Sequence, residues 1–303
     1  MMKAWINRFS LTALRQGALN LSVVLVLASV VGLVTKGINF GVDFTGGVVT
    51  ELATHYPPEQ EQMAEQLDLL LVDGYSMSRS GANHWIVRQG LEMSEAVTAN
   101  WHSQLPDAWQ VELLGSSIIG PQVGSELFEM GGLAIFASLL AMMIYLSFRF
   151  EWRLALASVI ALFHDVLLVL GLFAWLQIEF DLTVMAAVLA VIGYSLNDSI
   201  VIGDRIREYL RASSKIELDT QINRALASTM TRTLVTSGTT LLTVACIWLL
   251  AGAPLQAFAI ALFSGIVIGT FSSVGIGATL PKVLGLQASD YQLIEPTRNG
   301  RVG

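Results

Sequence analysis

Long apolar runs, separated by shorter polar segments, dominate the pattern along the chain. Six of them are close to the length that a helix needs to cross the hydrocarbon core of a membrane, about 20 residues. They cover residues 17–35, 129–148, 154–176, 183–203, 234–252 and 257–280. They are evenly apolar, whereas a transmembrane β-strand has only about 10 residues of alternating character. The pattern therefore predicts an α-helical integral membrane protein with six transmembrane helices.

The composition supports this class, since 53% of the residues are apolar and 14% are charged, against about a quarter charged in soluble domains. The first run follows Lys3, Arg8 and Arg15, as in a signal peptide. However, its apolar core is longer than the roughly 7–15 residues of a signal, and no small-residue cleavage site follows. We expect an uncleaved helix there. Cys246, the single cysteine, is expected to be a small buried apolar residue.

The basic residues indicate how the helices are oriented. The termini, and the loops that alternate to the same side, carry most of the 17 Lys and Arg residues, whereas the opposite loops at 177–182 and 252–256 carry none. Because cytoplasmic loops are enriched in Lys and Arg, we expect both termini in the cytoplasm. The basic, amphipathic segment 204–232 is expected to be a solvated loop with a helix lying at the membrane surface.

The polar stretch between the first two predicted helices is long enough to form a small domain outside the cytoplasm. Residues 46–54 favour a strand, and 57–74 favour a helix that starts at Pro and ends at Gly. Two short strands around the turn "SGANH", a second helix "EMSEAVTANWHSQL" and a last strand "AWQVELLG" follow. This βαββαβ order predicts a ferredoxin-like α+β periplasmic domain. His55, His84 and His102 lack metal-ligand spacing, and no metal or cofactor is expected.

The chain is thus expected to have four parts. The N-terminus and first helix occupy 1–36, the periplasmic domain with its connector 37–128, helices two to six 129–280, and the cytoplasmic tail 281–303. Gly and Pro in the segment 115–132 predict a hinge-like connector back to the membrane.

Polar residues inside the apolar runs are the candidates for chemistry. His164 and Asp165 interrupt the third run, Asn197 and Asp198 the fourth, and Arg232 directly precedes the fifth. A charge at the bilayer centre costs at least about 2.5–3.5 kcal/mol. The helical rise places Asp198 about 8 Å below the cytoplasmic edge, where Arg232 begins the next helix, so an ion pair is feasible. His164 and Asp165 are adjacent and point in different directions, so they cannot both face Asp198.

Three roles remain open for such a buried carboxylate. Low dielectric raises the pKa of a carboxyl group and a nearby Arg lowers it, so a change in their distance binds or releases a proton. The alternatives are a static polar clamp between helices and a site for an ion other than the proton.

The last apolar run carries small residues at every fourth position. They are Ala257, Ala261, Gly265, Gly269, Ser273 and Gly277. Such a stripe lets another helix approach closely, and the partner helix belongs either to this chain or to another subunit.

Several long motifs, in order along nearly the whole chain, resemble those of the SecD/SecF family of protein-export membrane proteins, within the resistance-nodulation-division superfamily. They are "GVDFTGG" (41–47), "GPQVGSEL" (120–127), "FDLTVMAAVLAVIGYSLNDSIVIGDRIRE" (180–208) and "TRTLVTSGTTLLTV" (231–244). The short external domain and the form of the third motif are typical of the SecF members.

The resemblance implies a multi-pass protein of the bacterial inner membrane that pairs with SecD. The pair associates with the SecYEG channel and YajC, and uses the proton-motive force to draw exported preproteins outward. Asp198 corresponds to the family's intramembrane carboxylate and Arg232 to its arginine. Asp43, Gly46 and Gly47 belong to the "DFTGG" motif, where Asp43 is expected to be structural.

The chain lacks the Walker A sequence G-x-x-x-x-G-K-[ST], so nothing in it indicates ATP hydrolysis. Neither an enzymatic activity nor a nucleic-acid partner is expected. Two other functions remain open. One is half of a proton-coupled exporter of small molecules or lipids from the same superfamily, which needs a substrate pocket in its external domain. The other is a scaffold that transports nothing and tolerates loss of the buried charge.

Overall fold

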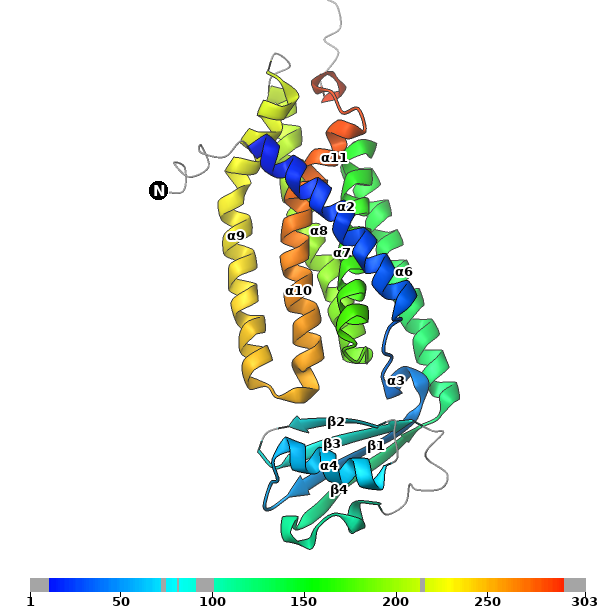
Figure 1. The fold of residues 1–303 in the computed structure, drawn as a ribbon. Helices are drawn as coiled ribbons and strands as arrows, with labels where there is room; N and C mark the ends of the chain where they lie inside the picture. The colour runs from blue at the N-terminus through cyan, green and yellow to red at the C-terminus, as the bar shows by residue number, and fades with distance from the viewer. Residues whose placement is uncertain (1–10, 72–74, 81, 91–100, 213–215, 292–303) are drawn as a thin grey trace, which may run out of the picture.

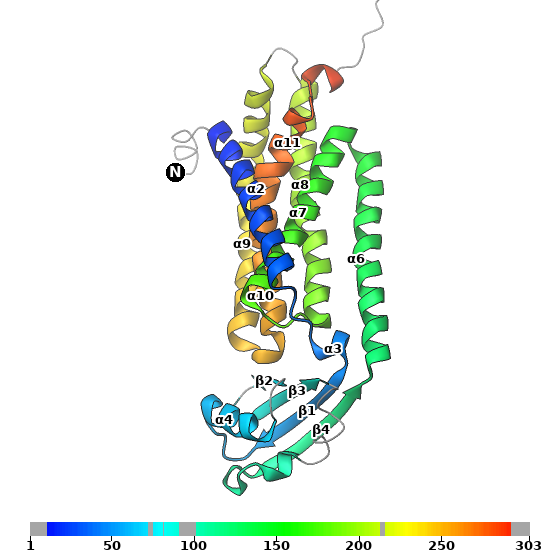
Figure 2. The same cartoon turned by 45° about the vertical axis from the view of Figure 1, so that its right-hand side comes forward.

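The computed structural model describes residues 11–71, 75–80, 82–90, 101–212 and 216–291. A bundle of long helices stands on a small sheet (Figures 1 and 2). Six helical segments are long and apolar enough to cross a membrane, which confirms the predicted number. They are α2 (Leu11–Thr35), α6 (Pro121–Arg149), α7 (Trp152–Leu176), α8 (Leu182–Ala212), α9 (Leu218–Leu250) and the segment Gln256–Val283.

Several helices extend beyond the apolar runs that predicted them. α8 continues to Ala212 and α9 begins at Leu218. The expectation of a separate surface helix within 204–232 is therefore wrong. Hydropathy detects the part of a helix that suits hydrocarbon, whereas the backbone hydrogen bonds continue through polar sequence into water.

α7 is the central helix of the bundle. Most of its residues are buried, and it packs against α2, α8 and α10 (Gln256–Ser272). α2, α6 and α9 lie at the periphery, with most of their apolar side chains exposed. Cys246 is on the exposed side of α9, so its expected burial is wrong for this chain taken alone.

The last membrane segment is not one regular helix. α10 passes into a π-helical turn, Ser273–Gly277, and then into α11 (Ala278–Val283), which contains Pro281. π-Helical turns of this kind occur often at functional sites.

Four antiparallel strands form the sheet below the bundle. They are β1 (Gly47–Thr54), β2 (Tyr75–Ser80), β3 (His84–Gly90) and β4 (Val111–Ile119), in the order β2-β3-β1-β4. The helix α4 (Gln60–Leu70) packs on it, and its Met63 and Leu67 meet Leu52 and Trp85 in a small core.

The second helix of the predicted domain falls largely outside the described residues, because 91–100 are not described. The part that is described, Trp101–Gln104, is a short 3₁₀ turn, and a second such turn spans Asp107–Trp109.

Two short joints connect the sheet to the bundle. α2 leads through α3 (Val42–Thr45) directly into β1, and β4 leads into α6 with Gly120 alone between them. Pro121 occupies the first turn of α6, where its missing N–H costs nothing. The region expected as a hinge-like connector is therefore a strand followed almost at once by a helix (Figure 2).

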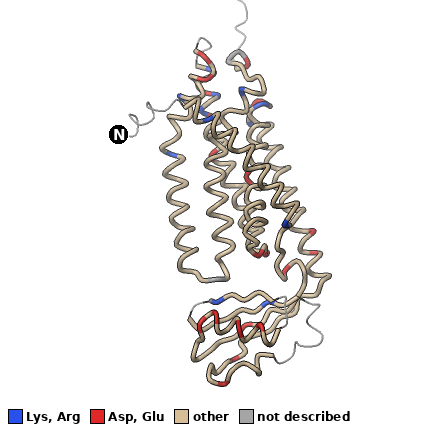
Figure 3. Tube along the Cα trace, in the orientation of Figure 1, with Lys and Arg blue, Asp and Glu red and all other residues tan. Residues whose placement is uncertain are grey.

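The charges of the bundle are distributed unevenly. Figure 3 shows Lys and Arg gathered mainly at the end of the bundle away from the sheet, while acidic residues line α4. Long stretches of the helices between the two ends carry no charge, and the buried carboxylates there stand out.

Candidate functional site

The "DFTGG" segment joins the sheet to the bundle. A carboxylate oxygen of Asp43 accepts a hydrogen bond from the Leu182 N–H at 3.1 Å, and Asp181 accepts one from the Val184 N–H at 2.9 Å. The two carboxylates thus cap the N-terminus of α8, where free N–H groups favour acceptors and negative charge. Asp43 thus caps a helix that begins 139 positions later in the sequence.

Gly46 and Gly47 are needed for different reasons. Gly46 has φ of 76°, in the left-handed region that glycine enters easily. Gly47 begins β1 so close to β3 that a Cβ would collide with the backbone carbonyl of Gln89. Edge-on contacts between Phe40, Phe128 and Phe180 surround this joint.

Asp198 lies on the buried face of α8 and is 4% exposed. Thr233 Oγ1, on α9, donates to Asp198 Oδ1 at 3.5 Å, while Oδ2 has no hydrogen-bond partner among the described residues. A buried carboxylate with an unmatched oxygen is costly, and this oxygen has room in its hydrogen bonding for a proton or a water molecule. Asn197, the neighbouring residue, points the other way and is exposed.

Arg232 is exposed at the start of the apolar part of α9. It lines a cavity of about 260 Å³ between α8 and α9, together with Asp204 and Glu208. Among the described residues, no ion pair within 4.0 Å involves Arg232, although its charge is within electrostatic reach of Asp198. Thr233, the residue after Arg232, contacts Asp198, so the two predicted partners lie on adjoining stretches of α8 and α9 without a direct bond.

Asp165 is the centre of a second buried polar cluster. Its Oδ2 accepts hydrogen bonds from Ser195 Oγ of α8 at 2.5 Å and from Ser272 Oγ of α10 at 2.9 Å. Its Oδ1 is 2.9 Å from His164 Nδ1. Adjacent residues start about 100° apart around a helix, so we expected the two side chains to diverge. They nevertheless meet, because the ring turns Nδ1 back toward its neighbour.

The stripe of small residues on the last membrane segment packs against α8 of the same chain. A Cβ at Gly265 would collide with Val191, and one at Gly269 would lie 3.0 Å from Cβ of Ser195. Ala261 is buried in the core of the bundle, Ser273 is buried in the π-helical turn, and a Cβ at Gly277 would approach Ser199 Oγ to 4.0 Å. The close approach at Gly269 brings Ser272 to Asp165.

Other small and polar residues in the membrane segments remain exposed. On α8 these are Ala186, Ala190, Gly193 and Asn197, and on α9 they are Arg232, Thr239 and Thr243. Their spacing places each set on one face of its helix. Together with Thr236 and Thr240, they form what we call the polar face of the bundle. The hydroxyls of Thr239 and Thr243 bond to carbonyls of their own helix.

Sequence reasoning missed two features of the site. Ser195 and Ser272 were not among the predicted site residues, although Ser195 stands one helical turn before Asp198. Arg15 was read as flanking charge, but it is 1% exposed and pairs with Asp219 at 2.8 Å, while Lys282 also contacts that carboxylate. A spacing of 204 positions between ion partners leaves no local sequence signal.

No group of three or more His, Cys, Asp or Glu side chains in the described parts of the chain is arranged to hold a metal ion. The polar groups of the site are carboxylates, hydroxyls, the imidazole of His164 and the guanidinium of Arg232.

Two family models match the chain. The model of the C-terminal part of the SecD/SecF protein export membrane proteins matches residues 103–287, and the SecD/SecF GG motif matches residues 31–55. A protein translocase subunit SecF from Vibrio alginolyticus is 40% identical over 72% of this chain and 71% of its own length. The SecF subunit of Pseudomonas aeruginosa is 38% identical over 78% of both chains.

Solved structures of SecDF are also similar. The crystal structure of SecDF, a translocon-associated membrane protein from Thermus thermophilus, matches with a TM-score of 0.81 and 29% identity, over 91% of this chain and 38% of that one. SecDF in its super-membrane-facing form matches with a TM-score of 0.68 and 29% identity, over 91% and 39%. This chain therefore spans less than half of the solved chains. By the family models and these relatives, the chain belongs to the SecD/SecF family of protein-export membrane proteins.

Proposed function

We propose that this protein is an auxiliary subunit of the Sec translocase that promotes protein export across the bacterial inner membrane as the SecF partner of SecD. Its relatives carry the name SecF, and it matches only part of the longer SecDF chain. A separate SecD chain would supply the remaining part.

The polar face of the bundle supports such a partner. Asn197, Thr239 and Thr243 are exposed in the spanning part of their helices, and polar side chains in a membrane generally face other helices or a water-filled cavity. We assign this face to SecD. SecYEG, YajC and exported preproteins complete the proposed assembly.

The proposed orientation places both termini in the cytoplasm and the sheet in the periplasm. The Lys and Arg residues at the bundle end away from the sheet support it. A ferredoxin-like fold of the sheet domain is supported by the strand order β2-β3-β1-β4 with all neighbours antiparallel.

The export step is coupled to the proton-motive force through Asp198, with Arg232 as its electrostatic partner. The observation that carries this proposal is the buried carboxylate whose Oδ2 has no partner among the described residues. Such an oxygen can accept a proton without breaking an existing bond. Movement of the Arg232 guanidinium toward or away from Asp198 changes the proton affinity of the carboxylate.

Two substitutions separate a proton carrier from a static clamp. Asp198→Asn keeps an acceptor for the Thr233 hydroxyl but cannot take up a proton, whereas Thr233→Val removes the hydrogen bond and keeps the carboxylate. With SecD and SecYEG in proteoliposomes, we expect gradient-dependent export to be lost in Asp198→Asn and largely retained in Thr233→Val. The reverse result identifies a clamp, and normal export by Asp198→Asn refutes the relay.

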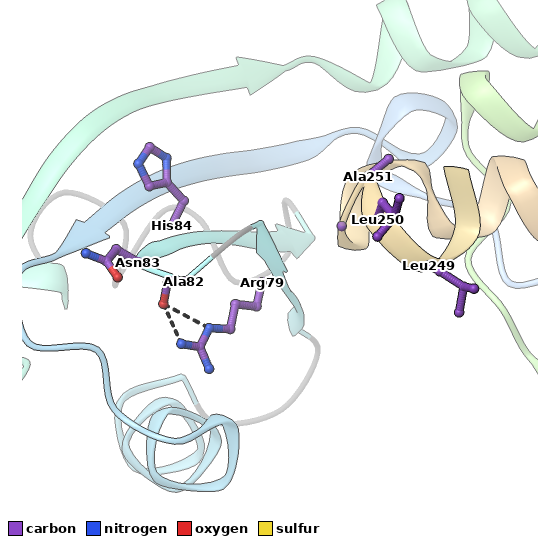
Figure 4. A pocket seen from close by; sticks show the side chains of 8 residues that line it. Arg79, Ala82, Asn83, His84, Leu249, Leu250 and Ala251 are labelled. Carbon is purple, nitrogen blue, oxygen red and sulfur yellow. Dashed lines mark hydrogen bonds between the residues drawn. The ribbon is translucent and has the colours of Figure 1, made fainter. Parts of the chain in front are cut away.

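A small-molecule exporter is the second candidate, and a cavity beside the sheet can be compared with the pocket that it would need. A cavity of about 850 Å³ lies between the β2–β3 hairpin and the tip of α9 (Figure 4). Arg79, Asn83 and His84 line one wall, and the exposed Leu249 and Leu250 line the other. Ligand sites usually enclose most of their ligand, whereas these two walls face each other across an open gap. The cavity gives weak support to an exporter.

A further inference from the structure

We propose that Asp165, with His164, is a second proton-holding site that exchanges protons with Asp198 through buried hydroxyl groups. The inference rests on the proposed proton coupling and extends it from a single carboxylate to a relay of two. Its geometric basis is the packing of α7, α8 and α10 against one another (Figures 1 and 2). At their contact Ser195 of α8 and Ser272 of α10 both donate to Asp165 of α7.

The two carboxylates are linked through one face of α8. Ser195 donates to Asp165 Oδ2, and Asp198 follows Ser195 by three positions, so the two side chains are neighbours on the helix surface, with Cβ atoms about 5–6 Å apart. Both residues are buried, at 1% and 4% exposure. Among the described residues no hydrogen bond joins Ser195 to Asp198, so a proton that passes between them crosses about one helical turn of the buried interior.

Buried groups without partners lie beside this link. In the described residues, Asp198 Oδ2, Ser199 Oγ and His164 Nε2 have no hydrogen-bond partner, and Ser199 is 4% exposed while His164 is 5% exposed. Buried polar groups in proteins are normally satisfied, often by ordered water. Ser199 also lies next to Gly277 of the π-helical turn, which follows directly after Ser272.

The partners of Asp165 suit both of its protonation states. When it is ionised, the Ser195 and Ser272 hydroxyls donate to Oδ2 and the imidazole donates from Nδ1 to Oδ1. When it is protonated, its carboxylic-acid O–H donates a hydrogen bond to one of the hydroxyl oxygens or to Nδ1 of the neutral imidazole. The proposed path has an ordered water between Ser195 and Asp198. This water and the Ser195 hydroxyl each take one proton and give one, so one proton moves between the carboxylates while the water and the hydroxyl keep their composition.

Few other titratable groups face this site. α10 carries no charged residue or histidine, and Arg15 is the one charged residue of α2. The titratable or charged residue nearest to Asp165 in sequence on α7 is His164, and the buried one on α8 is Asp198. On α9, Arg232 stands next to Thr233, which contacts Asp198. The described part of α6 has Glu126, Glu129 and Arg149, all near the ends of that helix. His164 and Asp198 are therefore the titratable groups that the proposed path includes.

The test uses Asp165→Asn and Ser195→Ala in the full chain with SecD and SecYEG in proteoliposomes, driven by a proton gradient without sodium. The asparagine keeps the acceptor for both hydroxyls and the contact with His164, so packing is preserved. We expect gradient-dependent export to fall at least about tenfold in Asp165→Asn, with partial recovery in Asp165→Glu. The double variant with Asp198→Asn should be no worse than the single variants, because both residues serve one path.

Infrared difference spectra between high and low pH detect the protonation of carboxyl groups, and that of Asp165 would not change with pH if the residue had only a structural role. We expect two carboxylic-acid bands in the native protein, loss of one in Asp165→Asn, and a shift of a band in Ser195→Ala. Normal export by Asp165→Asn, an unchanged set of bands, or a requirement for sodium would each overturn the inference. Loss of export in Asp198→Asn together with normal export in Asp165→Asn refutes only the second site, whereas normal export in both refutes the proposed coupling itself.

Discussion

Gly124 illustrates how a single residue holds the sheet domain to the bundle. It lies in the first turns of α6, and a Cβ there would be 2.5 Å from the backbone oxygen of Phe44. Backbone cannot move aside as a flexible side chain can. We expect Gly124→Ala to lower the free energy of unfolding by about 1–3 kcal/mol through overpacking, as measured by thermal unfolding in detergent.

The matched control at this scale is Gly132→Ala in the same helix. No atom lies within 4 Å of its Cβ position, and Gly132 is exposed. Alanine should there raise the stability by about 0.5–1 kcal/mol, because glycine is the poorer helix former. Equal melting temperatures for the two variants would show that α6 and α3 do not pack as described.

The packing of whole helices leads to a second prediction. Gly265 lies against Val191, so Gly265→Ala should push α10 away from α8 and lower the stability by about 1–3 kcal/mol. Gly238→Ala in α9 has open space around its Cβ position and serves as the control. If both variants unfold like the native protein, the small-residue stripe has no packing role within this chain.

The same elements show what sequence could predict. Six apolar runs predicted six membrane helices, because hydrocarbon accepts only segments that satisfy their own backbone. Hydropathy alone could not predict the ends of these helices. The fifth apolar run begins at residue 234, whereas α9 begins at Leu218. Asp165 and Asp198 were found because charge is rare in such helices. Their hydroxyl partners, Ser195, Ser272 and Thr233, were not identified, because serine and threonine are common there and only the fold brings them together.

At the scale of the whole molecule, the polar face of the bundle predicts how the chain assembles. Thr243 lies on this face, whereas Leu234 is exposed on a different side of α9. A tryptophan at position 243 would obstruct a helix packed against the face, and a tryptophan at position 234 would meet lipid. We expect Thr243→Trp to reduce co-purification with SecD several-fold and Leu234→Trp to leave it unchanged.

The cause of such a loss can be checked on the isolated chain. Because both positions are exposed in the described structure, neither substitution should change its thermal unfolding in detergent. Loss of SecD binding with unchanged stability then locates the interface on the face that carries Asn197 and Arg232. This would place the partner beside Arg232, so that movement between the two subunits would shift the guanidinium relative to Asp198. If Leu234→Trp weakened binding while Thr243→Trp did not, SecD would contact the opposite side of α9, and the coupling would have to act through the bundle interior.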